Sequence, residues 1–127
     1  MSVLRLQPSY KDYLWGGDAF RRIYHRADAP DGIAAESWEA ACHPHGSAFI
    51  DSGAYHGLTL DQAAASAGDA FYGTRVTDGH LPVLFKLIDA RERLSVQVHP
   101  DDAYAAREGE RGKNEMWVVL RDRKSVV

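Results

Sequence analysis

The sequence predicts a mainly β domain with one or two short helices. Short segments rich in Val, Ile, Phe and Trp alternate with polar residues or form brief apolar runs, and turn residues separate them. Only one segment shows a clear helical period with a capping signal. The 127 residues, 45% hydrophobic and 26% charged, suit one globular domain.

The first half of the chain offers three strand segments and one turn. Residues 3–6 favour a short strand that Pro8 ends. Residues 15–18 (WGGD) favour a turn in which the paired glycines adopt positive φ, and they lack the ending of a phosphate loop. Residues 32–41 predict a strand, and residues 49–50 begin another extended piece.

A short helix is predicted directly after Thr59. Thr59 and Gln62 have the spacing of a capping box, and Gly68 suits the end of the helix. Four apolar residues fall on one helix face, namely Leu60, Ala63, Ala64 and Ala67.

The second half predicts three further strands and a second short helix. Residues 81–88 form a nearly continuous apolar run, and residues 94–99 alternate between apolar and polar side chains. Pro100 and two aspartates favour a helix through residue 107, and residues 114–120 return to strand character.

Charge and cysteine content exclude several classes of protein. Fifteen Lys plus Arg residues against 18 Asp plus Glu give a net charge of −3, which does not favour a nucleic-acid partner. The apolar runs are too short to span a membrane, and the first residues lack the core of an export signal. Cys42 is the only cysteine, so an internal disulfide is impossible and a reducing cytoplasm is the expected location.

The segment SVQVHP at residues 95–100 carries the most informative pattern. Strand periodicity places Leu94, Val96 and Val98 toward the core. It places three polar side chains together on the opposite face, about 7 Å apart along the strand: Ser95, Gln97 and His99.

A second polar pair follows in the sequence. Glu115 comes sixteen residues after His99, and Lys113 shares its strand face. A strand lying beside the first would bring Glu115 opposite His99. Gln97, His99 and Glu115 together suit a divalent metal such as zinc, although an amide oxygen is an uncommon zinc ligand. The alternative is that His99, which precedes Pro100, is a surface or capping residue.

Other polar residues have ordinary structural explanations. Pro44 between His43 and His45 favours a turn over a metal site. Glu36 and Glu39 fall on opposite strand faces, which excludes a paired-carboxylate site. The remaining expectations are packing for Trp38 and Trp117, a buried unreactive thiol for Cys42, and solvent exposure for His25, His56 and His80.

Several motifs together resemble a known family. SVQVHPDD followed by GKNEMW is similar to the type I mannose-6-phosphate isomerases, in particular the shorter bacterial form. The segments YLWGG, AESWEAACHPHG and LPVLFKLIDARERLSVQVHP agree with this resemblance, which runs in order from about residue 4 to residue 120.

The resemblance implies a zinc-dependent cupin, a jelly-roll β-barrel with the metal inside. It implies that Gln97, His99 and Glu115 are the metal ligands and that Ser95 and Lys113 line the sugar-phosphate pocket. The implied reaction interconverts mannose 6-phosphate and fructose 6-phosphate through a cis-enediol, with Lys113 as the candidate catalytic residue. Lys86 is then expected to point into the barrel or toward its rim.

The resemblance also implies that this chain is a fragment. Family members continue well beyond residue 120 and supply a further histidine ligand and an arginine there. We therefore expect residues 1–120 to form the N-terminal part of the catalytic domain, with an incomplete barrel. Residues 121–127 resemble the translation of a sequencing adapter and are expected to be a non-native tail.

Two other functions remain open from the sequence. Histidine and carboxylate ligands also suit an iron-dependent cupin oxygenase. A cupin remnant that binds sugar or has no catalytic role would need no complete site. The resemblance implies a small sugar phosphate as the partner, and the sequence does not indicate an oligomeric state.

Overall fold

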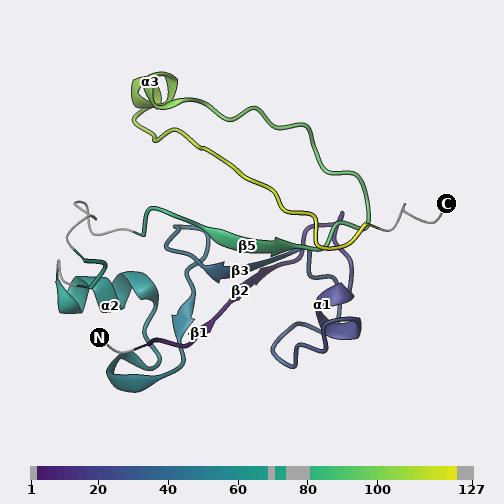
Figure 1. Cartoon of the computed structure of the whole chain (residues 1–127), viewed down its shortest axis with the longest axis horizontal. Coiled ribbons are helices and arrows are strands. Elements are labelled where there is room, and N and C mark those ends of the chain that lie inside the picture. The colour runs from purple at the N-terminus through teal and green to yellow at the C-terminus, as the bar shows by residue number, and fades with distance from the viewer. Residues whose placement is uncertain (1–2, 69–70, 74–80, 123–127) are drawn as a thin grey trace. The chain divides into compact units, whose positions relative to one another are not determined.

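A computed structural model describes residues 3–68, 71–73 and 81–122, which form two units. The N-terminal unit ends at Leu94, and the C-terminal unit begins at Ser95. Each unit has its own internal contacts (Figure 1).

The described residues of the N-terminal unit form two small antiparallel sheets. The larger sheet has the order β2 (Ser9–Lys11), β3 (Glu36–Ala40) and β5 (Phe85–Ile88), so that the central β3 pairs on both sides (Figure 1). The smaller sheet pairs β1 (Leu6–Gln7) with β4 (Phe49–Ile50). The prediction of a mainly β fold with short helices is thus confirmed.

Short helices accompany these sheets. In the N-terminal unit they are α1 (Ala19–Arg22), α2 (Leu60–Ala67) and a 3-10 turn at Gly53–Tyr55. The capping box predicted for α2 is confirmed: the Gln62 backbone N–H donates to Thr59 Oγ1 at 3.2 Å, and the Thr59 N–H donates to Gln62 Oε1 at 3.0 Å. No helix in the described part of the chain is both long and apolar enough to cross a membrane.

Two small apolar cores hold the N-terminal unit together. The first packs β4 against α2 through Ile50, Leu60 and Ala63. The second gathers around Phe20 of α1, whose ring meets the edge of Tyr10 at 5.8 Å between centroids. Burial of such side chains is the main favourable contribution to folding.

Arg26 anchors the loop after α1 to the larger sheet. Its guanidinium pairs with Glu39 of β3 and with Asp28, and Asp28 also accepts a hydrogen bond from the Tyr10 hydroxyl at 3.0 Å. Burial alone would raise the pKa of the Asp28 carboxyl, but these hydrogen bonds hold it below its usual 3.8.

The turn at Gly16 and Gly17 differs from the expectation. Neither glycine has positive φ; both are needed because the backbone passes very close to other groups. A Cβ on Gly16 would lie 2.5 Å from the Ala35 Cα, and a Cβ on Gly17 would meet the buried carboxylate of Asp89. That carboxylate accepts a hydrogen bond from the Ala19 N–H at 2.6 Å at the start of α1.

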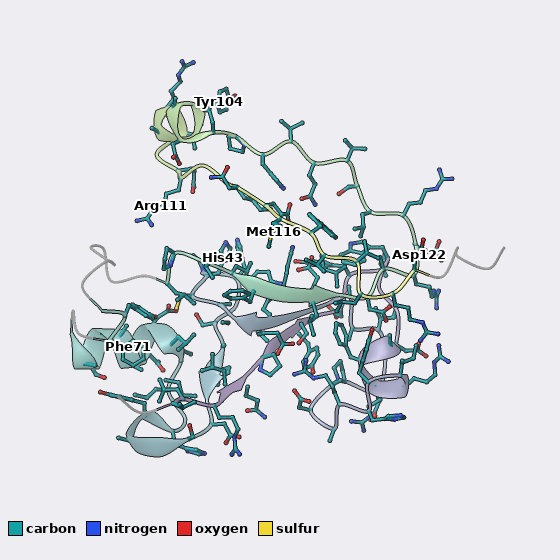
Figure 2. All side chains as sticks on the ribbon, in the orientation of Figure 1. His43, Phe71, Tyr104, Arg111, Met116 and Asp122 are labelled. Atoms are coloured by element: carbon teal, nitrogen blue, oxygen red, sulfur yellow. The ribbon has the colours of Figure 1, made fainter. Side chains whose placement is uncertain are left out.

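The C-terminal unit consists of two long arms, a first arm of residues 95–101 and a second arm of residues 109–122. They are joined at α3 (Asp102–Ala105), which continues into a 3-10 turn at Ala106–Glu108 (Figure 1). The short helix predicted after Pro100 is therefore confirmed. Figure 2 shows Tyr104 projecting from this helix, and its side chain is exposed.

The strands predicted over residues 94–99 and 114–120 are wrong as paired strands. Both segments run without a ladder partner among the described residues. Val96 and Val98, expected to face the core, are 98% and 91% exposed, and Leu94 is also exposed. The alternating pattern predicted which side chains share a face, but a strand also needs a neighbouring backbone to accept and donate its hydrogen bonds.

Candidate functional site

His99 and Glu115 meet in the C-terminal unit. His99 Nε2 is in direct contact with Glu115 Oε2, although sixteen residues separate them in the sequence. The two side chains are only 22% and 18% exposed. The chain reversal at α3 between the two arms makes this contact possible.

The donor atoms of this pair fit a zinc ion. A neutral imidazole nitrogen and a carboxylate oxygen are both common zinc ligands, and here one atom of each type points to the same place. The described residues contain no group of three or more His, Cys, Asp or Glu side chains that could hold a metal. The pair therefore supplies two donors. A third protein ligand must be a side chain other than His, Cys, Asp or Glu, or it must come from outside the described residues.

Ser95 and Gln97 form a second pair on the same arm. The Gln97 side-chain amide donates to Ser95 Oγ at 3.4 Å, and both residues are exposed. Their contact agrees with the prediction that these side chains share a face. The structure thus brings the predicted residues together as two pairs, His99 with Glu115 and Gln97 with Ser95.

Lys113 lies on the other arm, two residues before Glu115. Its backbone N–H donates to the Pro100 carbonyl at 3.0 Å, which ties the start of this arm to the residue after His99. Lys113 is exposed, so its ammonium is open to a ligand carrying negative charge. Trp117, expected to pack, is instead 55% exposed.

His43 and His45 lie in a turn beside the larger sheet. The His45 backbone N–H donates to His43 Nδ1 at 3.1 Å, and the His43 ring packs edge-on against Trp38 with 5.4 Å between centroids. Figure 2 marks His43 in this position. These contacts agree with the structural role expected from Pro44. His25 and His56 are exposed as expected, and His80 lies outside the described residues.

The two glutamates of β3 point to opposite faces, as predicted. Glu39 accepts from Ser37 Oγ at 2.7 Å on one face. On the other face the Trp38 indole N–H donates to Glu36 at 2.6 Å, and Lys86 Nζ lies 3.2 Å from the same carboxylate.

The pairing of Glu36 with Lys86 was not predicted. Trp38 of β3 faces Lys86 of β5 in the register, so the Lys86 side chain reaches Glu36 along a diagonal between adjacent strands. Predicting it from sequence would have required the register between segments fifty residues apart.

Cys42 has the environment of an unreactive thiol. Cys42 is half-buried, less than the full burial expected. Its Sγ lies 3.0 Å from the Tyr72 hydroxyl, and burial raises the pKa of the Cys42 thiol. A raised pKa leaves little thiolate near neutral pH, which agrees with the expectation that Cys42 is not a nucleophile.

Comparison with known proteins agrees with these features. Residues 3–120 match the family described as phosphomannose isomerase type I, catalytic domain. The mannose-6-phosphate isomerase of Streptococcus mutans is 38% identical over 118 residues, and a probable mannose-6-phosphate isomerase of Bacillus subtilis is 40% identical over 120 residues. The alignments cover 92% of this chain in both cases, but only 36% and 37% of those relatives, so the chain spans about a third of their length.

Solved structures give the same result. The crystal structure of the mannose 6-phosphate isomerase from Bacillus subtilis matches with a TM-score of 0.74 and 35% identity over 86% of this chain and 34% of its own. A mannose 6-phosphate isomerase structure bound with zinc and yttrium matches with a TM-score of 0.63 and 30% identity, covering 84% of this chain and 28% of that one. These neighbours have the cupin fold, whose barrel is not closed by the described residues of this chain. The chain belongs to the type I phosphomannose isomerase family, with residues 3–120 matching part of its catalytic domain.

Proposed function

We propose that this chain is part of a zinc-dependent aldose–ketose isomerase that interconverts mannose 6-phosphate and fructose 6-phosphate. The observation that carries the proposal is the contact between His99 Nε2 and Glu115 Oε2 in a chain of this family. An imidazole nitrogen and a carboxylate oxygen are donor types that catalytic zinc sites use, and this pair brings one of each together.

The proposed metal ligands are His99, Glu115 and Gln97. The first two side chains are mostly shielded from water, which favours a tightly held ion. Gln97 lies two residues before His99 and supplies an amide oxygen as the third donor. A zinc ion in this place would supply Lewis-acid chemistry, offsetting negative charge on the sugar oxygens as the proton moves between C2 and C1.

Lys113 and Ser95 are the proposed substrate contacts. The Lys113 ammonium provides positive charge two residues from Glu115, so it can stabilise an oxygen that becomes negative in the cis-enediol. The Ser95 hydroxyl already accepts a hydrogen bond from Gln97 and can donate one to a sugar hydroxyl. We also propose a cytoplasmic location, based on the single cysteine of the chain.

A coupled assay for fructose 6-phosphate tests this function. It is run with and without added zinc on the 127-residue chain and on a longer chain in which residues 1–120 are joined to the rest of the Bacillus subtilis relative. We expect zinc-dependent turnover in the longer chain and little in the shorter one. Lys113→Ala should lower turnover of the longer chain by about 100-fold or more, whereas Arg107→Ala, which also removes an exposed positive charge, should not.

Three results would contradict the proposal. Turnover that is independent of zinc would exclude the metal role of His99 and Glu115. A longer chain that folds, binds zinc and still turns over no mannose 6-phosphate would favour a different substrate or a non-catalytic cupin. Oxygen consumption with added iron would favour the cupin oxygenase.

A further inference from the structure

The two arms of the C-terminal unit are held together by a small group of contacts at α3. The Gly112 backbone N–H donates to Asp102 Oδ1 at 3.1 Å, and the Lys113 N–H donates to the Pro100 carbonyl at 3.0 Å. We call these two contacts the α3 clasp. They join Pro100 and Asp102, which follow His99 at the start of α3, to Gly112 and Lys113, which precede Glu115.

We propose that the α3 clasp, through Asp102 and Gly112, fixes the place where His99 and Glu115 meet. Both would then be positioning residues for the metal pair. The inference rests on the proposed function for its metal, but the contact between the two side chains can be measured without it.

The absence of a β ladder is the first reason for this inference. The arms have no ladder pairing among the described residues, so a regular sheet does not set their register. Pro100 has no N–H, so its backbone can accept a hydrogen bond from Lys113 but cannot donate one in return. A side-chain acceptor on α3 is therefore needed to hold the second arm close, and Asp102 supplies it.

The close approach at Gly112 is the second reason. A Cβ on Gly112 would lie 2.6 Å from the Asp102 backbone nitrogen, 2.6 Å from Asp102 Oδ1 and 2.8 Å from the Asp101 carbonyl carbon. Two of these atoms belong to the backbone and cannot rotate away. Any side chain at position 112 would push the second arm off α3 and carry Glu115 with it.

The helix itself is held in place at its start. Asp101 caps α3 by accepting a hydrogen bond from the Tyr104 N–H at 2.8 Å, which fixes the first turn and with it the position of Asp102. Asp102 thus presents its carboxylate to the second arm from a fixed backbone. Outer residues that orient metal ligands in this way typically change metal affinity by about 10- to 100-fold when they are mutated.

Two measurements on the 127-residue chain test the proposal. The first is the nuclear Overhauser effect between the His99 ring and the Glu115 side chain in metal-free protein. The second is the zinc dissociation constant from calorimetric titration with zinc alone. We expect Asp102→Ala and Gly112→Ala to abolish the first signal and to weaken zinc binding by about tenfold or more.

Matched variants separate positioning from general damage. Asp102→Asn keeps an oxygen acceptor at Oδ1 and should retain both signals. Glu108→Ala removes an exposed acid from the adjacent 3-10 turn and should leave both unchanged. Gly32→Ala adds a methyl where nothing lies within 4 Å and controls for Gly112→Ala.

The outcomes distinguish this inference from the proposed function. If the His99–Glu115 signal and zinc affinity survive Asp102→Ala in folded protein, the clasp does not position the pair and the inference is wrong. If the unmodified 127-residue chain shows the signal but binds no zinc, the donors of this chain are too few to hold the ion alone, and loss of the signal in Asp102→Ala still supports the clasp. If the unmodified protein shows no such signal, the pair is not preformed and the inference is overturned directly.

Discussion

Removing the positive charge of Lys86 should destabilise the larger sheet. The Glu36 side chain is only 9% exposed, and the Trp38 indole and the Lys86 ammonium both contact its carboxylate. The Lys86→Met variant keeps the apolar stem of the side chain but leaves a buried carboxylate without its cation. An uncompensated buried charge of this kind costs about 3–5 kcal/mol.

The exposure of Lys86 lowers that figure. Its side chain is 22% exposed, so water reaches one side of the pair and takes over part of the role of the ammonium. We therefore expect Lys86→Met to reduce the free energy of unfolding by about 2–3 kcal/mol. Glu36→Gln should cost about 1 kcal/mol, because the amide oxygen still accepts from Trp38 and Lys86 can turn toward solvent.

Urea unfolding at pH 7, followed by circular dichroism, measures these differences. The double variant of Glu36→Gln and Lys86→Met should be more stable than Lys86→Met alone, because no buried charge remains without a partner. Arg107→Met provides the control for loss of an exposed positive charge and should stay within about 0.5 kcal/mol of the unmodified protein. A Lys86→Met variant inside that same range, or a double variant whose cost equals the sum of the single costs, would refute the argument.

Three further changes test other parts of the N-terminal unit. Gly16→Ala should lower stability by about 1–3 kcal/mol in urea unfolding, because its Cβ would overlap Ala35; Gly32→Ala, which adds a methyl in open space, should cost almost nothing. Thr59→Ala removes the cap of α2 and should cost about 1 kcal/mol, measured as a lower thermal midpoint; an unchanged midpoint would mean that α2 does not need its cap. Asp28→Asn should be less stable than the unmodified protein at pH 6. Because the pKa of this carboxyl is lowered in the folded state, its contribution is fully present above pH 3.8 and disappears as the pH falls through the lowered value. A stability difference that stays constant down to pH 2 would contradict that assignment.

Local signals in the sequence predicted the elements that depend on local contacts. The capping box at Thr59 and the Pro100 start of α3 lie within a few residues of the helices they begin, and both helices form there. The apolar run before residue 88 predicted β5, which is shorter than expected and covers Phe85–Ile88. β3 is likewise confined to Glu36–Ala40, inside the predicted segment.

Elements that depend on distant partners were harder to predict. β2 exists because Ser9–Lys11 pairs with β3, and α1 is held by the carboxylate of Asp89, seventy residues away from Ala19. The strand segment carries no strong strand propensity, and a four-residue helix is too short to be stable without such a contact. At residues 94–99 the opposite happened: a clear alternating pattern predicted a strand, but the segment has no ladder partner among the described residues.

For the candidate site, the predicted contact forms, but the structural reason for it differs from the one expected. The sequence predicted that His99 and Glu115 would meet across two paired strands, and the two side chains do meet although those strands do not pair. The contact must therefore have a cause other than a sheet register. The reversal at α3 provides it, since the arms leave a four-residue helix and are tied together at Gly112 and Lys113.

This arrangement bears on how such a site forms. A chain reversal closed by local hydrogen bonds brings two donors together over a separation of sixteen residues, at a smaller entropic cost than a pairing between distant strands. The donor pair can then form from contacts within the C-terminal unit alone. Metal binding would then require the two donor atoms to move apart far enough to admit the ion, and the remaining ligands to approach a pair of side chains that already lie close together.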